Sequence, residues 1–94
     1  MPSLTEEELI ESYQRYIEPI YSFFSLKLLN KKIAEDLTSE VFMLFVKHIK
    51  QNKPIENIQA YLFGIARNVF LMHLRKKYQE PSVSYSEIHD FSAY

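Results

Sequence analysis

A single glycine, Gly64, stands among the 94 residues of this chain, together with four prolines. An all-β domain needs many tight turns, and most tight turns depend on these two residue types. Their scarcity argues against an all-β domain and favours long helices. One glycine also cannot form a glycine-rich phosphate-binding loop, which excludes nucleotide-binding enzymes of that kind.

Three stretches with helical periodicity follow one another, over about residues 5–29, 32–50 and 54–79. In each of them apolar residues recur at steps of three and four positions, the spacing of one helix face. We therefore predict an all-α fold, a small bundle of three to four helices that occupies residues 1–80. Residues 81–94 show no clear period and are expected to form a linker or a disordered tail.

Capping and helix-breaking residues set the expected boundaries. Ser3 or Thr5 can cap the first helix, since each is followed by a glutamate three positions later. Pro19 is expected to kink this helix or to divide it in two, because its ring displaces one backbone hydrogen bond. Pro54 or Asn57 is expected to open the third helix.

The second helix carries more apolar residues than one core face needs. Its expected core arc consists of Ile33, Leu37, Val41, Leu44, Phe45 and His48. Opposite this arc lies an apolar strip with an acidic rim, made of Asp36, Ser39, Glu40, Phe42, Met43 and Val46. Such a strip indicates either a partner-binding surface or a helix that its neighbours bury on both sides.

The third helix also shows two apolar strips. Its expected core arc consists of Ile58, Tyr61, Leu62, Ile65, Val69 and Met72. The second strip, roughly opposite, consists of Phe63, Phe70 and Leu74. Two-sided burial would leave one outward polar ridge with Arg67, Asn68 and Arg75, whose groups are able to meet phosphates.

Charge is distributed unevenly, although the net charge is only −1. Glutamates crowd the first eighteen residues, whereas residues 57–79 contain no acidic residue and include Arg67, Arg75, Lys76 and Lys77. A local basic surface is typical of a nucleic-acid contact. Basic residues at a helix C-terminus also oppose the helix dipole, so charge alone leaves both interpretations open.

The residues that catalysis or metal binding would require are missing or scattered. There is no cysteine, and His48, His73 and His89 have no metal-ligand spacing. We therefore predict a binding module that is not an enzyme and needs no metal or cofactor. The sequence has no apolar run of bilayer length and no signal peptide, so a cytoplasmic protein without membrane contact is expected.

The ordered motifs of the second and third stretches resemble those of a known family. They are Ala34-Glu35-Asp36-Leu37, Ser39-Glu40-Val41-Phe42, Tyr61-Leu62 and Ile65-Ala66-Arg67-Asn68. This series is similar to conserved region 2 of the sigma-70 transcription initiation factors, and especially to the extracytoplasmic-function (ECF) group. The resemblance covers roughly residues 5–80. Ser39 stands where the family usually has glutamine, and Tyr61 stands where it usually has tryptophan.

The resemblance implies two binding surfaces. In the family, the second helix docks on a coiled-coil of the RNA polymerase beta-prime subunit, which assigns docking to Asp36, Ser39, Glu40, Phe42 and Met43. The third helix and the loop before it bind the promoter −10 element and capture a base flipped from the non-template strand. This assigns DNA binding to Asn52, Lys53, Asn57, Tyr61, Arg67, Asn68, Arg75, Lys76 and Lys77. Tyr61 could stack on a base or be buried, since it also lies on the core arc.

The resemblance also implies a second, helix-turn-helix domain that reads the upstream promoter element. This chain is too short to hold that domain, so we expect a fragment or a single-domain relative. An anti-sigma factor that masks the docking helix is a further partner that the resemblance allows. The alternative function is a sigma-like helical protein-interaction module that does not bind DNA.

Overall fold

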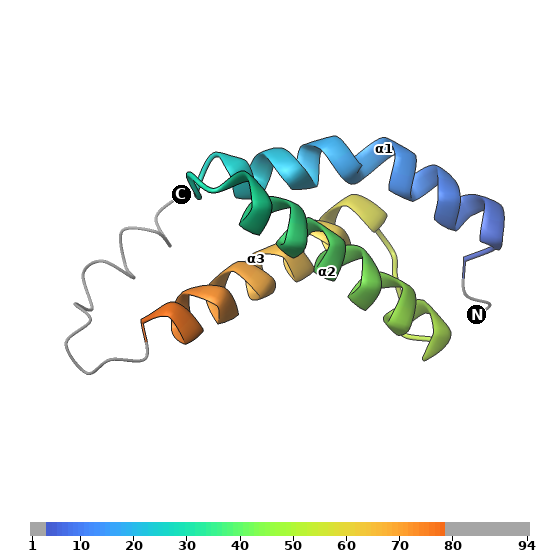
Figure 1. The fold of residues 1–94 in the computed structure, drawn as a ribbon. Coiled ribbons are helices and arrows are strands. Elements are labelled where there is room, and N and C mark those ends of the chain that lie inside the picture. The colour runs from blue at the N-terminus through green and yellow to red at the C-terminus, as the bar shows by residue number, and fades with distance from the viewer. Residues whose placement is uncertain (1–3, 79–94) are drawn as a thin grey trace.

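The computed structural model describes residues 4–78 of the chain. They form three α-helices of 20 residues each, α1 (Glu6–Ser25), α2 (Lys31–Lys50) and α3 (Ile58–Lys77) (Figure 1). The expected all-α class is confirmed, and the described part of the chain holds three helices. The expected tail, residues 81–94, lies outside the described residues.

Side chains cap the start of each helix. Thr5 Oγ1 accepts a hydrogen bond from Glu8 N (3.1 Å), and Glu8 Oε1 accepts one from Thr5 N (2.8 Å), which completes a capping box. These two bonds, the backbone one first, hold the pKa of the Glu8 carboxyl below its ordinary value. Asn30 caps α2, and Asn57 caps α3 by accepting a 2.9 Å bond from Ala60 N. The expected caps Thr5 and Asn57 are thus confirmed.

Pro19 does not divide the first helix. α1 continues from Glu6 to Ser25 without interruption, so the expected split is wrong, and the expected kink is not confirmed. A proline inside a helix deprives the carbonyl four residues earlier, here that of Arg15, of its donor. Both residues are exposed, so water can replace the missing donor.

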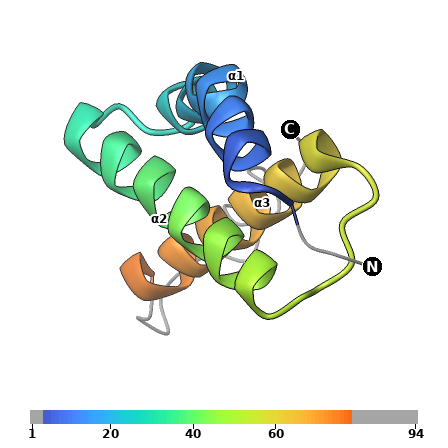
Figure 2. The ribbon, with the colours of Figure 1, turned by 90° about the vertical axis from the view of Figure 1, so that its right-hand side faces the viewer.

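One hydrophobic core lies where the three helices meet. α2 packs against both α1 and α3, and a wide loop joins α2 to α3 (Figure 2). The largest fully buried side chains come from every helix: Ile20, Phe24, Val41, Phe45 and Leu62. Full burial of one such side chain contributes about 1.5–3 kcal/mol, so these contacts hold the helices in place.

The buried face of α3 differs from the expected one. Met72, expected in the core, is 53% exposed, whereas Phe70 and Leu74 of the second strip are buried. Both strips border one broad buried face that includes Leu62 and Val69, because α1 and α2 both pack against α3. Periodicity gives the spacing of apolar residues but not the direction from which the neighbours pack.

Candidate functional surfaces

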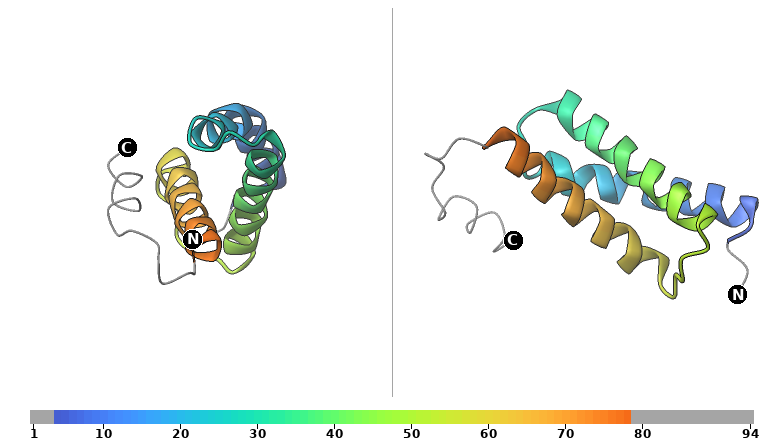
Figure 3. Two further views of the ribbon diagram at one scale, coloured as in Figure 1. Left: turned by 60° about the vertical axis from the view of Figure 1, so that its left-hand side comes forward. Right: turned by 90° about the horizontal axis from the view of Figure 1, so that it is seen from below.

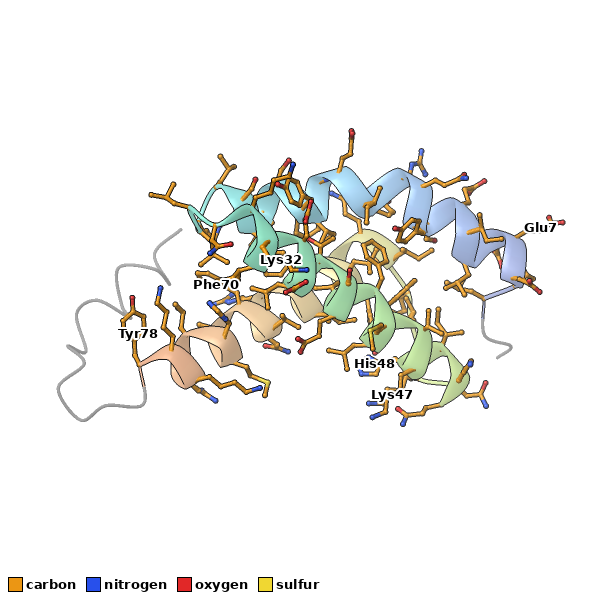
Figure 4. All side chains as sticks on the ribbon, in the orientation of Figure 1. Glu7, Lys32, Lys47, His48, Phe70 and Tyr78 are labelled. Carbon is orange, nitrogen blue, oxygen red and sulfur yellow. The ribbon has the colours of Figure 1, made fainter. Side chains whose placement is uncertain are left out.

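Four residues of the expected docking set are exposed on α2: Asp36, Ser39, Glu40 and Met43. Their spacing of three and four positions brings them onto one stripe, which we call the α2 outer face. The carboxylate of Asp36 lies 3.6 Å from Lys32 Nζ, and both side chains are largely exposed. An exposed pair of this kind is weak, so Asp36 stays available to a partner. Figure 4 marks Lys32 near the start of α2.

Phe42 does not belong to the α2 outer face. It is only 7% exposed, and its ring packs edge-on against Tyr13 of α1 with 5.0 Å between the ring centroids. For Phe42 the structure therefore favours the second interpretation of the strip, a helix that its neighbours bury on both sides. Because α1 covers one flank of α2, the expected apolar strip is divided: Phe42 joins the core, while Met43 remains 70% exposed.

A groove of about 730 Å³ follows the boundary between α1 and α2. Ser39 and Met43 of the α2 outer face line it, together with Tyr13, Ile17 and Phe42. The sequence analysis missed the contribution of α1 to this surface. Tyr13, an aromatic residue on α1 that stays about half exposed, was the available signal.

The loop of residues 51–57 holds three members of the expected DNA-binding set; it is the yellow-green connection in Figure 3. Asn52 has a φ of 57°, a left-handed conformation that asparagine tolerates better than most residues. The side-chain oxygen of Asn57 is engaged in capping α3. Lys53 is exposed. The loop therefore offers one exposed lysine, one asparagine with a left-handed backbone and one asparagine whose side-chain oxygen caps α3.

Three further members of the set come together beside α3. Tyr61, Arg67 and Asn68 line a hollow of about 710 Å³, to which His48 and Gly64 also contribute. We call this site the α2–α3 hollow. The remaining members, Arg75, Lys76 and Lys77, are exposed in the last turn of α3 and do not line the hollow. The structure thus places the expected DNA-binding residues in a loop, a hollow and a basic helix end.

His48 connects α2 to this hollow. Its Nδ1 lies 2.8 Å from the hydroxyl of Tyr61, and the two rings are nearly perpendicular, at 88°. Partial burial lowers the pKa of the His48 imidazole below its ordinary value, and Lys53 and Lys47 lower it further. Figure 4 shows His48 and Lys47 in the C-terminal half of α2. Sequence analysis assigned His48 to the core and did not find its contact with Tyr61.

Comparison with known proteins identifies the family. Residues 9–80 match the family model described as Sigma-70 region 2. The chain belongs to the sigma-70 region 2 family. It is 35% identical over 74 residues to the ECF RNA polymerase sigma factor SigM of Bacillus subtilis (strain 168). That match covers 79% of this chain and 45% of the relative, so the chain spans less than half the length of SigM. The resemblance to the ECF group is confirmed, and no solved structure matches the chain significantly.

The sigma factor family consists of transcription factors that are not enzymes. Within residues 4–78, no group of three or more histidine, aspartate and glutamate side chains could hold a metal ion. None of the described helices is long and apolar enough to cross a membrane.

Proposed function

We propose that this region 2 domain docks on the beta-prime coiled-coil of RNA polymerase and binds the promoter −10 element during transcription initiation. The observation that carries the proposal is the α2 outer face, an exposed acidic and apolar stripe within the family motif. Asp36 and Glu40 can pair with basic groups of the partner. Met43 supplies apolar area that loses water on contact. An anti-sigma factor that covers this face would compete with the polymerase.

The DNA-binding part of the proposal depends on α3. Lys76 and Lys77 can neutralise backbone phosphates, and the amide of Asn68 has both a donor and an acceptor for a base edge. Extracting a base from the duplex costs a few kcal/mol, so the protein must offer a site that receives it. The α2–α3 hollow has an aromatic ring and polar groups at its edge, which supports this role.

Docking can be tested by pull-down of the chain with the beta-prime coiled-coil. We expect Glu40→Arg and Met43→Ala to reduce the amount captured by about tenfold, since contacts at the centre of an interface contribute 1–2 kcal/mol or more. Glu11→Arg is the matched control, because it makes the same charge change at an exposed position on α1 that lines neither groove beside α2. Equal capture of all variants would refute docking through the α2 outer face.

DNA binding can be tested with a single-stranded oligonucleotide that carries a −10 element, in the presence of polymerase core enzyme. We expect Arg67→Ala and Lys76→Ala to weaken binding, and Arg15→Ala, an exposed position on α1, to leave it unchanged. Docking without any contribution of α3 to DNA affinity would favour the alternative, a sigma-like protein-interaction module.

A further inference from the structure

The hydrogen bond between His48 and Tyr61 joins two helices at the edge of the α2–α3 hollow. The two residues are 13 positions apart, and the Tyr61 hydroxyl oxygen lies 2.8 Å from His48 Nδ1. The ring of Tyr61 also lies 6.3 Å, between centroids, from the ring of Phe45. Tyr61 is therefore fixed at its hydroxyl by His48 and packed along its side by Phe45, while part of its surface lines the hollow.

The chemical state of His48 suits this contact. Burial and the nearby Lys53 and Lys47 lower the pKa of His48, so the imidazole is neutral at neutral pH. A neutral imidazole whose Nε2 carries the proton presents Nδ1 as an acceptor, and the Tyr61 hydroxyl then donates to it. A half-buried tyrosine hydroxyl needs such a partner.

The floor of the hollow beside Tyr61 is open. Gly64 lies one helical turn after Tyr61, and a β-carbon added there would meet no atom within 4 Å. Packing therefore does not require a glycine at this position, and glycine weakens a helix interior. Asn68 follows Gly64 by one turn. Along one side of α3 the hollow is thus lined by the ring of Tyr61, the backbone at Gly64 and the amide of Asn68.

We propose that His48 is a positioning residue for DNA binding. Its hydrogen bond fixes the orientation of the Tyr61 ring at the edge of the α2–α3 hollow, so that an unpaired base packs against the ring and over Gly64. This inference depends on the proposed binding of the −10 element. The ring supplies the stacking surface, the open floor admits the flat base, and Asn68 contacts the base edge. His48 itself does not need to touch the DNA.

A double-mutant cycle tests the coupling. The affinity of the chain, bound to core polymerase, for single-stranded −10 DNA is measured for wild type, His48→Ala, Tyr61→Phe and the double variant. We expect each single variant to weaken binding about two- to tenfold, the usual effect of one neutral hydrogen bond, and the double variant to bind no more weakly than the singles. Additive losses, or no loss in either single variant, would overturn the inference.

Two amides distinguish positioning from bulk packing. His48→Asn places its side-chain oxygen near the position of Nδ1 and should restore most of the affinity. His48→Gln is the matched control, since its polar atoms lie nearer the position of Nε2 and should not restore the affinity. Equal affinities of both variants would contradict the role of Nδ1. Urea unfolding of each variant identifies losses that come from stability alone.

Gly64→Ala provides a readout that a purely structural role would not change. We expect this variant to be more stable than wild type and yet to bind single-stranded DNA several-fold more weakly, because the methyl group occupies the floor where the base would lie. Unchanged DNA affinity would contradict the open-floor part of the inference.

A variant outside the hollow separates a loss of DNA binding in general from a loss of the contact between His48 and Tyr61. Lys76 lies outside the hollow, so Lys76→Ala tests DNA binding without reference to His48. If Lys76→Ala weakens binding while the variants of His48, Tyr61 and Gly64 do not, only the inference fails. If wild type does not bind the DNA at all, the proposed function fails with it.

Discussion

Gly64 and His73 are two residues of α3 that do not maximise the stability of the helix. Gly64 lies in the middle of α3 at an exposed position where the helix would accept a side chain. His73 lies on the same helix with its Nε2 buried and without a hydrogen-bond partner in the described residues. Neither residue is optimal for helix stability, so both are informative positions for substitution.

Replacement of Gly64 by alanine is expected to raise the free energy of unfolding by about 0.5–1 kcal/mol, because alanine loses less conformational freedom than glycine in a helix. Chemical unfolding in urea measures the change. Ala60→Gly, an exposed change in the opposite direction on the same helix, should lower the stability. A destabilised Gly64→Ala variant would show that the space around this residue is not open.

Acidification is expected to destabilise the protein through His73. Burial and the nearby Lys77 lower its pKa, Glu40 of α2 raises it, and Lys76 lowers it, with a net lowering. Just below the ordinary histidine pKa, the His73 imidazole is therefore protonated in the unfolded chain but still neutral in the folded chain. The stabilisation is complete above about pH 6.5 and is lost as the pH falls towards the folded pKa.

Urea unfolding at pH 7.5 and pH 5.5 measures this loss. His73→Leu, which removes the titrating group at similar volume, should reduce the pH dependence. His48 should maintain part of it, because its pKa is lowered too. Glu8 stays ionised over this window, since its pKa is held below the ordinary 4.5. An identical pH dependence in wild type and His73→Leu would exclude His73 as a source.

At the scale of the helices, the sequence neighbours Phe42 and Met43 differ in burial. Phe42 is buried against Tyr13 of α1, whereas Met43 is exposed on the α2 outer face. Phe42→Ala is therefore expected to lower the free energy of unfolding by about 3–5 kcal/mol, the usual cost of removing a buried phenylalanine. Met43→Ala should change it by less than about 0.5 kcal/mol. Thermal or urea unfolding of the two variants tests this difference, and similar losses would contradict the different burial of the two side chains.

The positions and ends of the helices could be predicted from sequence because their signals are local. Thr5 with Glu8, and Asn57 before the third apolar run, satisfy backbone donors within one turn. Pro19 shows the limit of such signals, because a solvent-exposed proline is compatible with a continuous helix. A proline in the sequence does not show whether water can replace the hydrogen bond that the helix loses.

The buried faces and the sites could be predicted only in part, because they depend on contacts between helices. Met72 was assigned to the core wrongly, and the burial of Phe42 stayed undecided, because the sequence does not state from which direction α1 and α2 approach. The contact between His48 and Tyr61 joins residues 13 positions apart across a loop, so no periodicity in either helix reveals it. The order of the family motifs predicted the candidate binding residues, and the packing of the helices determines which of them face the solvent.

At the scale of the whole molecule, the acidic first turn of α1 and the basic last turn of α3 lie far apart, while the last turn of α2 is basic too. Glu6, Glu7 and Glu8 occupy the first turn of α1, and three basic residues occupy the last turn of α3, at the other end of the bundle (Figures 1 and 3). The α2 outer face and the α2–α3 hollow lie on different sides of α2. This separation supports the proposal that polymerase and DNA bind to different sides of the domain.

If the basic end of α3 contacts DNA as proposed, the affinity for DNA is expected to depend on salt. Each phosphate that a lysine or arginine neutralises releases counterions, so the logarithm of the affinity for a single strand falls with the logarithm of the salt concentration by about 0.7 per contact. Replacing both Arg75 and Lys76 by alanine should lower the magnitude of this slope by about 1.4 if each contacts one phosphate. Arg15→Ala, which removes a charge from α1, should leave the slope unchanged. Affinity for −10 DNA, measured at several salt concentrations with the same polymerase preparation, gives the three slopes. Equal slopes for all three proteins would move the phosphate contacts away from the last turn of α3.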